Sequence, residues 1–133
     1  MIIGMGVDLV DIARVKRLLA SKGTRALERL FTPAEARYAL QRVHPYVHLA
    51  ARIAAKEAAY KALSGTDAAR GLGWREMEVM LDALGRPSLA LHGKAALRAG
   101  ELRVAHAWLS LSHSEATAGA VVVLEQLDGV AGR

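Results

Sequence analysis

The chain has 133 residues, no cysteine and a formal net charge of +5. The lack of cysteine excludes disulfides and cysteine metal sites, and a chain of this length is expected to fold as one domain over 1–133. No apolar run reaches the ~20 residues that span a bilayer, and Asp8 interrupts the first apolar stretch too early for a secretory signal, so we expect a cytoplasmic protein with no membrane partner.

The first predicted element is a strand over 2–8, where β-branched and apolar residues dominate. Alternation along a strand puts Gly4, Gly6 and Asp8 on one face, where bare backbone leaves room for a ligand beside a carboxylate. The alternative is that the two glycines mark a bulge or close strand packing, and that Asp8 caps the helix that follows.

A helix is predicted next, at about 11–21, and it begins a strongly basic segment. Its inner face is formed by three apolar residues at helical spacing: Ile12, Val15 and Leu19. Against a single acid, Glu28, the segment carries six cations: Arg14, Lys16, Arg17, Lys22, Arg25 and Arg29. This charge calls for an anionic partner, although an ordinary solvated face is the alternative for Lys16, Lys22 and Arg29 taken singly.

Two more helices are predicted before the middle of the chain. A short helix begins at Pro33, since Thr32 can cap it and Glu35 stands at the third helical position. After a polar connection over 41–48, a longer helix is predicted over about 47–64, followed by a glycine that is typical of a helix end.

The long helix has polar residues on one half and alanine on the other. Arg52, Lys56 and Tyr60 follow one another around the helix, and Glu57 and Lys61 continue the same arc. The opposite half would let a neighbouring element approach closely, because it consists of small residues: Ala54, Ala55, Ala58, Ala59 and Ala62.

The polar arc has the residue types of a site for a metal-bound polyphosphate. Lys61 follows Glu57 by one helical turn, so the two side chains can reach a common point. Mg²⁺ is usually held by one or two carboxylates together with substrate phosphate and water, and a nearby ammonium can neutralise phosphate oxygens. Asp8 and Glu57 would supply two carboxylates. The alternative is an exposed amphipathic helix with an ordinary Glu–Lys pair.

The second half of the chain is predicted to contain mostly strands, which with the first strand and the helices indicates an α+β fold. A turn signal at Gly85-Arg86-Pro87 separates two of them, and alternation places His113 at the end of an apolar face. A single histidine is more often structural than functional, and no hydrolase triad is indicated. The predicted elements are strands over 77–81 and 88–91, a helix over 94–99, and strands over 108–114 and 117–124.

Five motifs occur in order along nearly the whole chain, from Gly4 to about Glu125. They are Gly4-x-Gly6-x-Asp8, Phe31-Thr32-x-x-Glu35-x-x-Tyr38, Arg52-x-Ala54-Ala55-Lys56-Glu57-Ala58-x-x-Lys61-Ala62, Gly85-Arg86-Pro87 and Ser112-His113-Ser114. Their order and spacing resemble the holo-acyl-carrier-protein synthase family of 4′-phosphopantetheinyl transferases. The resemblance implies that family's α+β fold, in which antiparallel strands pack on the long helix.

The resemblance also implies a reaction. Such enzymes transfer the 4′-phosphopantetheine group of coenzyme A to a serine of apo acyl carrier protein and release adenosine 3′,5′-bisphosphate. By position, Asp8 and Glu57 would hold Mg²⁺, or Mn²⁺ in its place, against the diphosphate of coenzyme A, and Lys61 would contact the phosphate and assist the leaving group. The general base is left open between Glu57 and a water held by the metal.

Further residues are assigned to binding by the same resemblance. Arg52, Lys56 and His113 would lie near the nucleotide end of coenzyme A, including its 3′-phosphate, and Arg86 is a weaker candidate. The basic helix would dock the acidic carrier protein, chiefly through three arginines: Arg14, Arg17 and Arg25. Relatives of this length form homotrimers with active sites between neighbouring subunits, so we expect that assembly here.

A nucleic-acid-binding domain is the rival class, because a basic protein can also track phosphates. Aromatic residues make up 5% of the chain and do not interleave with the basic cluster, so there is no platform for stacking bases. The carboxylates of Asp8 and Glu57 would also repel a phosphate backbone unless a metal intervened. We therefore expect no nucleic-acid partner.

Overall fold

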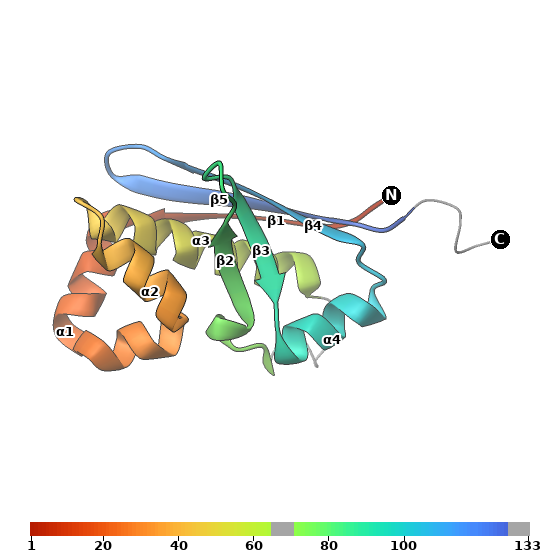
Figure 1. Ribbon diagram of the computed structural model, residues 1–133, viewed down its shortest axis with the longest axis horizontal. Coiled ribbons are helices and arrows are strands. Elements are labelled where there is room, and N and C mark those ends of the chain that lie inside the picture. The colour runs from red at the N-terminus through yellow and green to blue at the C-terminus, as the bar shows by residue number, and fades with distance from the viewer. Residues whose placement is uncertain (65–70, 128–133) are drawn as a thin grey trace.

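The structure is a computed structural model that describes residues 1–64 and 71–127, and it has the α+β architecture that the sequence predicts (Figure 1). Its strands are β1 (Ile2–Asp11), β2 (Met77–Leu81), β3 (Pro87–Leu91), β4 (His106–His113) and β5 (Thr117–Glu125), and its helices are α1 (Ile12–Leu30), α2 (Pro33–Leu40), α3 (Pro45–Leu63) and α4 (Gly93–Glu101). Within the described residues, none of the helices is long and apolar enough to cross a membrane.

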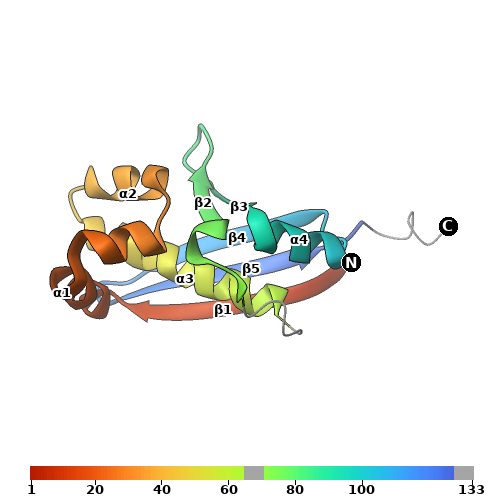
Figure 2. The same ribbon diagram turned by 90° about the horizontal axis from the view of Figure 1, so that it is seen from below.

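The main sheet is antiparallel, with strand order β1-β5-β4, and β2 and β3 form a separate hairpin. Helix α3 crosses one face of this sheet, with α1 and α2 near one of its ends and α4 near the other (Figure 2). The cross-strand register places Met5 opposite Val123 and Val123 opposite Trp108. This row and its neighbours lie on the face away from α3, and several of their apolar side chains are exposed.

The glycines of β1 allow α3 to lie directly against the strand backbone. A β-carbon on Gly6 would stand 1.9 Å from the carbonyl oxygen of Ala58, and one on Gly4 would stand 2.6 Å from that of Ala62. Both alanines are buried, as the alanine-rich half of the helix predicts. Close packing is therefore the correct interpretation of the two glycines, and the strand register also shifts between Ile2 and Gly4, as at a bulge. The prediction that their face leaves room for a ligand was wrong, because α3 occupies it.

The beginning of α2 follows the predicted capping pattern. The Thr32 hydroxyl accepts a hydrogen bond from the Glu35 amide (3.2 Å), and the Glu35 carboxylate accepts one from the Thr32 amide (2.9 Å). Pro33 occupies the first helical position, where its missing N–H is no loss. This capping box fixes the Glu35 side chain, which points into the protein and is buried.

Two helices extend beyond their predicted boundaries. Helix α1 continues to Leu30 through a kink at Gly23, which has a positive φ of 61° and was predicted to lie in a loop. Helix α3 begins at Pro45, within the segment predicted as a connection. Its last carbonyls are satisfied from α4, because the Arg98 guanidinium donates to the oxygens of Leu63 (2.8 Å) and Ser64 (3.3 Å).

Candidate active site

The strand β1 and the helix α3 bring Asp8 and Lys61 together. The Lys61 ammonium donates to Asp8 Oδ1 at 3.1 Å and to the Val7 carbonyl at 3.0 Å. Asp8 lies on the face of β1 that packs against α3, and it does not cap α1, whose N-cap is Asp11. The close approach of strand and helix thus joins two groups that are 53 residues apart in the chain.

Glu57 completes a cluster with Asp8 and Lys61. Partial burial raises the pKa of Glu57, and the negative charge of Asp8 raises it further, while Lys61 and Arg14 oppose the shift. The two carboxylates are therefore close enough to repel each other, and burial together with this repulsion outweighs the attraction of Glu57 to the nearby cations. Such a pair is a favourable place for a divalent cation.

The chemistry of this pair fits Mg²⁺ better than a metal held wholly by protein. In the described part of the chain, no three histidine or acidic side chains gather into a metal cluster. Mg²⁺ is typically bound by one or two carboxylates, with its other positions filled by water and substrate phosphates. Asp8 and Glu57 meet that requirement.

Lys56 does not lie where a nucleotide could reach it, which corrects the expectation from sequence. Its ammonium is fully buried and donates to Glu35 Oε1 (2.7 Å), to the Met77 carbonyl (2.8 Å) and to the Trp74 carbonyl (3.0 Å). All three N–H groups of the ammonium are therefore used inside the protein. Lys56 ties α3 to α2 and to the start of β2.

Arg52 and His113 line the same small pocket, as their shared assignment to the nucleotide end requires. The pocket has a volume of ≈ 260 Å³ and is formed by residues of α2, α3, β4 and the β2–β3 hairpin. Arg52 is 3% exposed, and its Nε atom is buried without a hydrogen-bond partner. No acidic residue is among the described residues that line the pocket.

Arg86 is on the turn of the β2–β3 hairpin, at the edge of this region. Its guanidinium donates to Asp82 Oδ2 at 2.8 Å and is largely exposed, whereas its neighbours Gly85 and Pro87 line the pocket. Arg86 therefore forms a salt bridge with Asp82, whereas Arg52 forms none with any residue that the structure describes.

The three arginines expected to dock a carrier protein are all exposed on α1. They are Arg14, Arg17 and Arg25. Arg14 also acts electrostatically on Glu57, so this end of α1 lies beside the carboxylate cluster. The buried face of the helix is formed by Val15, in agreement with the predicted apolar spacing.

Sequence reasoning missed the surroundings of Arg52. Tyr38 stacks against two guanidiniums, and the His48 ring meets Tyr38 edge-on with a centroid distance of 5.7 Å. Because residues 41–48 were interpreted as a polar connection, His48 was not recognised as a residue of the long helix. The sequence does indicate the true start of α3, because Pro45 is in the first turn, where proline is favoured.

Comparison with known proteins identifies the family. The profile of the 4′-phosphopantetheinyl transferase superfamily matches residues 4–122. The chain belongs to this superfamily. Among curated relatives, the holo-[acyl-carrier-protein] synthase of Geobacter sulfurreducens is 46% identical over 126 residues, which cover 95% of this chain and 99% of that protein.

Solved structures of this phosphopantetheinyl transferase family have the same fold. The holo-[acyl-carrier-protein] synthase of Neisseria meningitidis superposes with a TM-score of 0.83 at 34% identity, covering 95% of this chain and all of that one. A complex of the Chronobacterium ammoniagenes protein with coenzyme A gives a TM-score of 0.79 at 33% identity, with 93% and 97% covered. The predicted family, enzyme class and fold class are thus confirmed.

Proposed function

We propose that this enzyme transfers the 4′-phosphopantetheine group of coenzyme A to a serine of apo acyl carrier protein in the cytoplasm. The observation that carries the proposal is the cluster of Asp8, Glu57 and Lys61 where β1 meets α3. The names of the relatives and the coenzyme A complex of a similar structure support the same substrates.

The reaction is a displacement at phosphorus. The serine hydroxyl oxygen forms a bond to the phosphorus that carries pantetheine, and the bond from that phosphorus to the bridging oxygen breaks. Adenosine 3′,5′-bisphosphate leaves with the bond electrons, and the serine loses its proton. Mg²⁺, or Mn²⁺ in its place, would neutralise the diphosphate and polarise its phosphorus–oxygen bonds when bound.

The residues of the cluster have separate tasks in this proposal. Asp8 and Glu57 would hold the metal, and a carboxylate oxygen of Glu57 would accept the serine proton. Lys61 uses two N–H groups on Asp8 and Val7, which leaves a third for a phosphate oxygen. That contact stabilises negative charge as the phosphorus–oxygen bond breaks.

The nucleotide end of coenzyme A is assigned to the pocket that contains Arg52 and His113. The buried Arg52 guanidinium forms no salt bridge with a described residue and its Nε atom has no hydrogen-bond partner, which is costly even though the charge of Glu35 attracts it, and a bound phosphate would reduce that cost. Arg86 is close enough to this region to assist, but Asp82 already pairs with it. Lys56 has no part in nucleotide binding here, since its ammonium is enclosed.

A homotrimer with active sites between subunits is part of the proposal. Arg52 and Glu57 are separated by about 140° around α3, so a single coenzyme A would have to cross the helix to contact both in one subunit. A neighbouring subunit could supply one of the two. The outer face of the sheet offers an apolar surface for assembly, where Leu9 is 73% and Met5 is 64% exposed. A monomeric mass in light scattering would contradict this assembly.

The reaction class is tested by incubating apo acyl carrier protein with the enzyme, coenzyme A and Mg²⁺, followed by intact-mass analysis. We expect the carrier protein to gain one phosphopantetheine group, and we expect chelation of the metal to prevent the gain. An unchanged carrier mass with folded enzyme would overturn the proposed function.

Docking of the acidic carrier protein is expected to depend on Arg25. The Arg25→Glu variant should raise the KM for carrier protein roughly tenfold and leave the KM for coenzyme A unchanged, because a charge pair at the edge of an interface becomes a repulsion. Lys94→Glu makes the same charge change on α4, far from α1 (Figure 1), and serves as the matched control. Equal KM values for carrier protein in both variants would reject docking on α1.

A further inference from the structure

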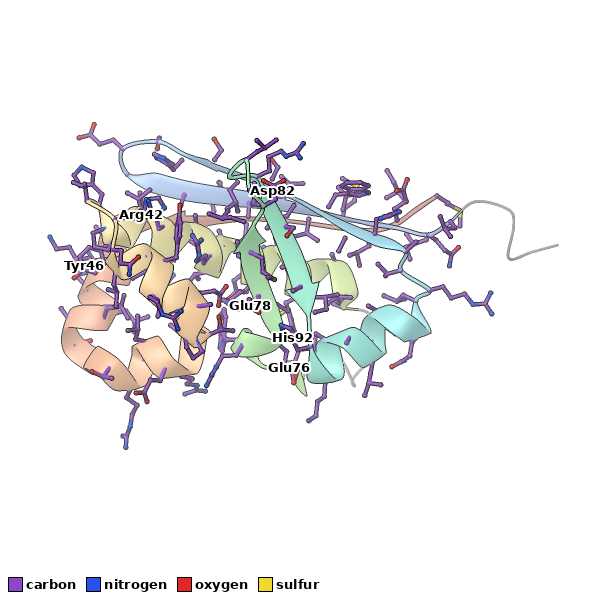
Figure 3. The ribbon with its side chains drawn as sticks, in the orientation of Figure 1. Arg42, Tyr46, Glu76, Glu78, Asp82 and His92 are labelled. Atoms are coloured by element: carbon purple, nitrogen blue, oxygen red, sulfur yellow. The ribbon has the colours of Figure 1, made fainter. Side chains whose placement is uncertain are left out.

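Tyr38 carries two arginine side chains on its ring. The Cζ atom of Arg42 is 4.1 Å from the ring centroid, and the Cζ atom of Arg52 is 4.6 Å from it. Tyr38 belongs to α2 and Arg52 to α3. Arg42 lies in the connection between these two helices (Figure 3). The ring thus gathers two cations from separate parts of the chain next to the pocket.

No acidic side chain lines this pocket, and Glu35, whose charge attracts Arg52, is already paired with Lys56. Arg52 has one hydrogen bond, from Nη1 to the His48 carbonyl at 3.3 Å, and no salt bridge to any described residue. Burial lowers the pKa of His48, and the charges of Arg52, Arg42, His113 and His44 lower it further. The described residues facing His48 therefore create a positive potential, which suits an anionic ligand.

The ring compensates part of this repulsion. Arg42 and Arg52 carry like charges at short range, and the negative face of an aromatic ring attracts a guanidinium, most strongly where water is excluded. Stacking also restricts the rotation of the planar group, so that its N–H donors point in fixed directions. Both effects come from the aromatic ring of Tyr38, and its hydroxyl is not needed for either.

We propose that Tyr38 is a positioning residue that aligns Arg52 and Arg42 for the phosphate monoester on the nucleotide end of coenzyme A. The proposal rests on the proposed function and adds two residues to it. Arg52 would contact the phosphate from inside the pocket, and Arg42 would contact it from the exposed rim. Tyr38 acts through these two arginines and takes no part in the displacement at phosphorus.

The experiment compares coenzyme A with 3′-dephospho-coenzyme A, which lacks the phosphate monoester. Transfer to apo acyl carrier protein is measured with the wild-type enzyme and with Tyr38→Leu, Tyr38→Phe and Arg42→Gln. We expect Tyr38→Leu to raise the KM for coenzyme A roughly tenfold, with the KM for the dephospho form and the kcat unchanged. Tyr38→Phe keeps the ring and should behave as the wild type.

Arg42→Gln provides a second arm should Tyr38→Leu fold poorly, because Arg42 is exposed. It should raise the KM for coenzyme A about threefold and leave that for the dephospho form unchanged. Equal changes in KM for both substrates in a folded variant would overturn the positioning role and indicate a structural one. An unchanged preference for coenzyme A in Tyr38→Leu and Arg42→Gln would also overturn it. No transfer by the wild-type enzyme would instead reject the proposed function.

Discussion

Replacing Glu57 by glutamine is expected to lower the rate of transfer on the order of 10³-fold, because one of two carboxylates that hold the metal is lost. The same change is expected to raise the thermal stability of the metal-free protein. Glutamine keeps the size of the side chain but carries no charge, so it removes both the burial of an ionised group and its repulsion by Asp8.

The sign of the stability change follows from the raised pKa of Glu57. The folded chain binds this proton more tightly than the unfolded chain, whose carboxyl has its ordinary value of 4.5. The free energy of unfolding therefore falls as the pH rises through the interval from that value to the raised pKa. At neutral pH the ionised form destabilises the metal-free fold, and glutamine relieves this.

Thermal unfolding with and without Mg²⁺ measures both effects on the same samples. The wild-type Tm should increase with Mg²⁺, whereas that of Glu57→Gln should not, and activity of the wild type should decline as acid protonates Glu57. Glu115→Gln, at an exposed position in the turn between β4 and β5, is the matched control. Near-full activity of Glu57→Gln would contradict the assigned metal site.

Patterns of residues close together in the sequence correctly predicted features that depend only on such residues. The capping box of Thr32 and Glu35 located the start of α2, and strand alternation placed His113 at the end of the inner face of β4. The glycine-and-alanine contact between β1 and α3 was one of two interpretations, and atomic separations were needed to choose between them.

The sequence could not reveal which polar residues of α3 are covered. A helical arc shows that Arg52, Lys56 and Glu57 share one half of the helix, but it does not show what packs against that half. Helix α2 and the β2–β3 hairpin cover Arg52 and Lys56, and they leave Glu57 partly exposed. Tertiary contacts between distant segments thus bury Lys56 in a structural ion pair and leave Glu57, the next residue, available for the metal site that we propose.

Replacing Lys56 by methionine is expected to lower the free energy of unfolding by about 3–5 kcal/mol, the usual effect of removing one partner of a buried ion pair. Glu35 would keep its bonds from the Thr32 and Val79 amides, but its charge would be buried without the ammonium. Burial lowers the pKa of Lys56 even though Glu35 opposes that shift, so the ammonium depends on this pairing to remain charged inside the protein.

Urea unfolding of the single and double variants tests this role at a fixed protein concentration. Lys56→Met combined with Glu35→Gln removes both charges and should be less destabilised than the sum of the two single changes. Lys94→Met, on the exposed face of α4, is the matched control and should stay within about 0.5 kcal/mol of the wild type. If Lys56 contacted nucleotide instead, Lys56→Met would raise the KM for coenzyme A in a protein of normal stability. That result would support the nucleotide-binding role that the sequence analysis assigned to Lys56, and it would contradict a purely structural role in the buried pair with Glu35.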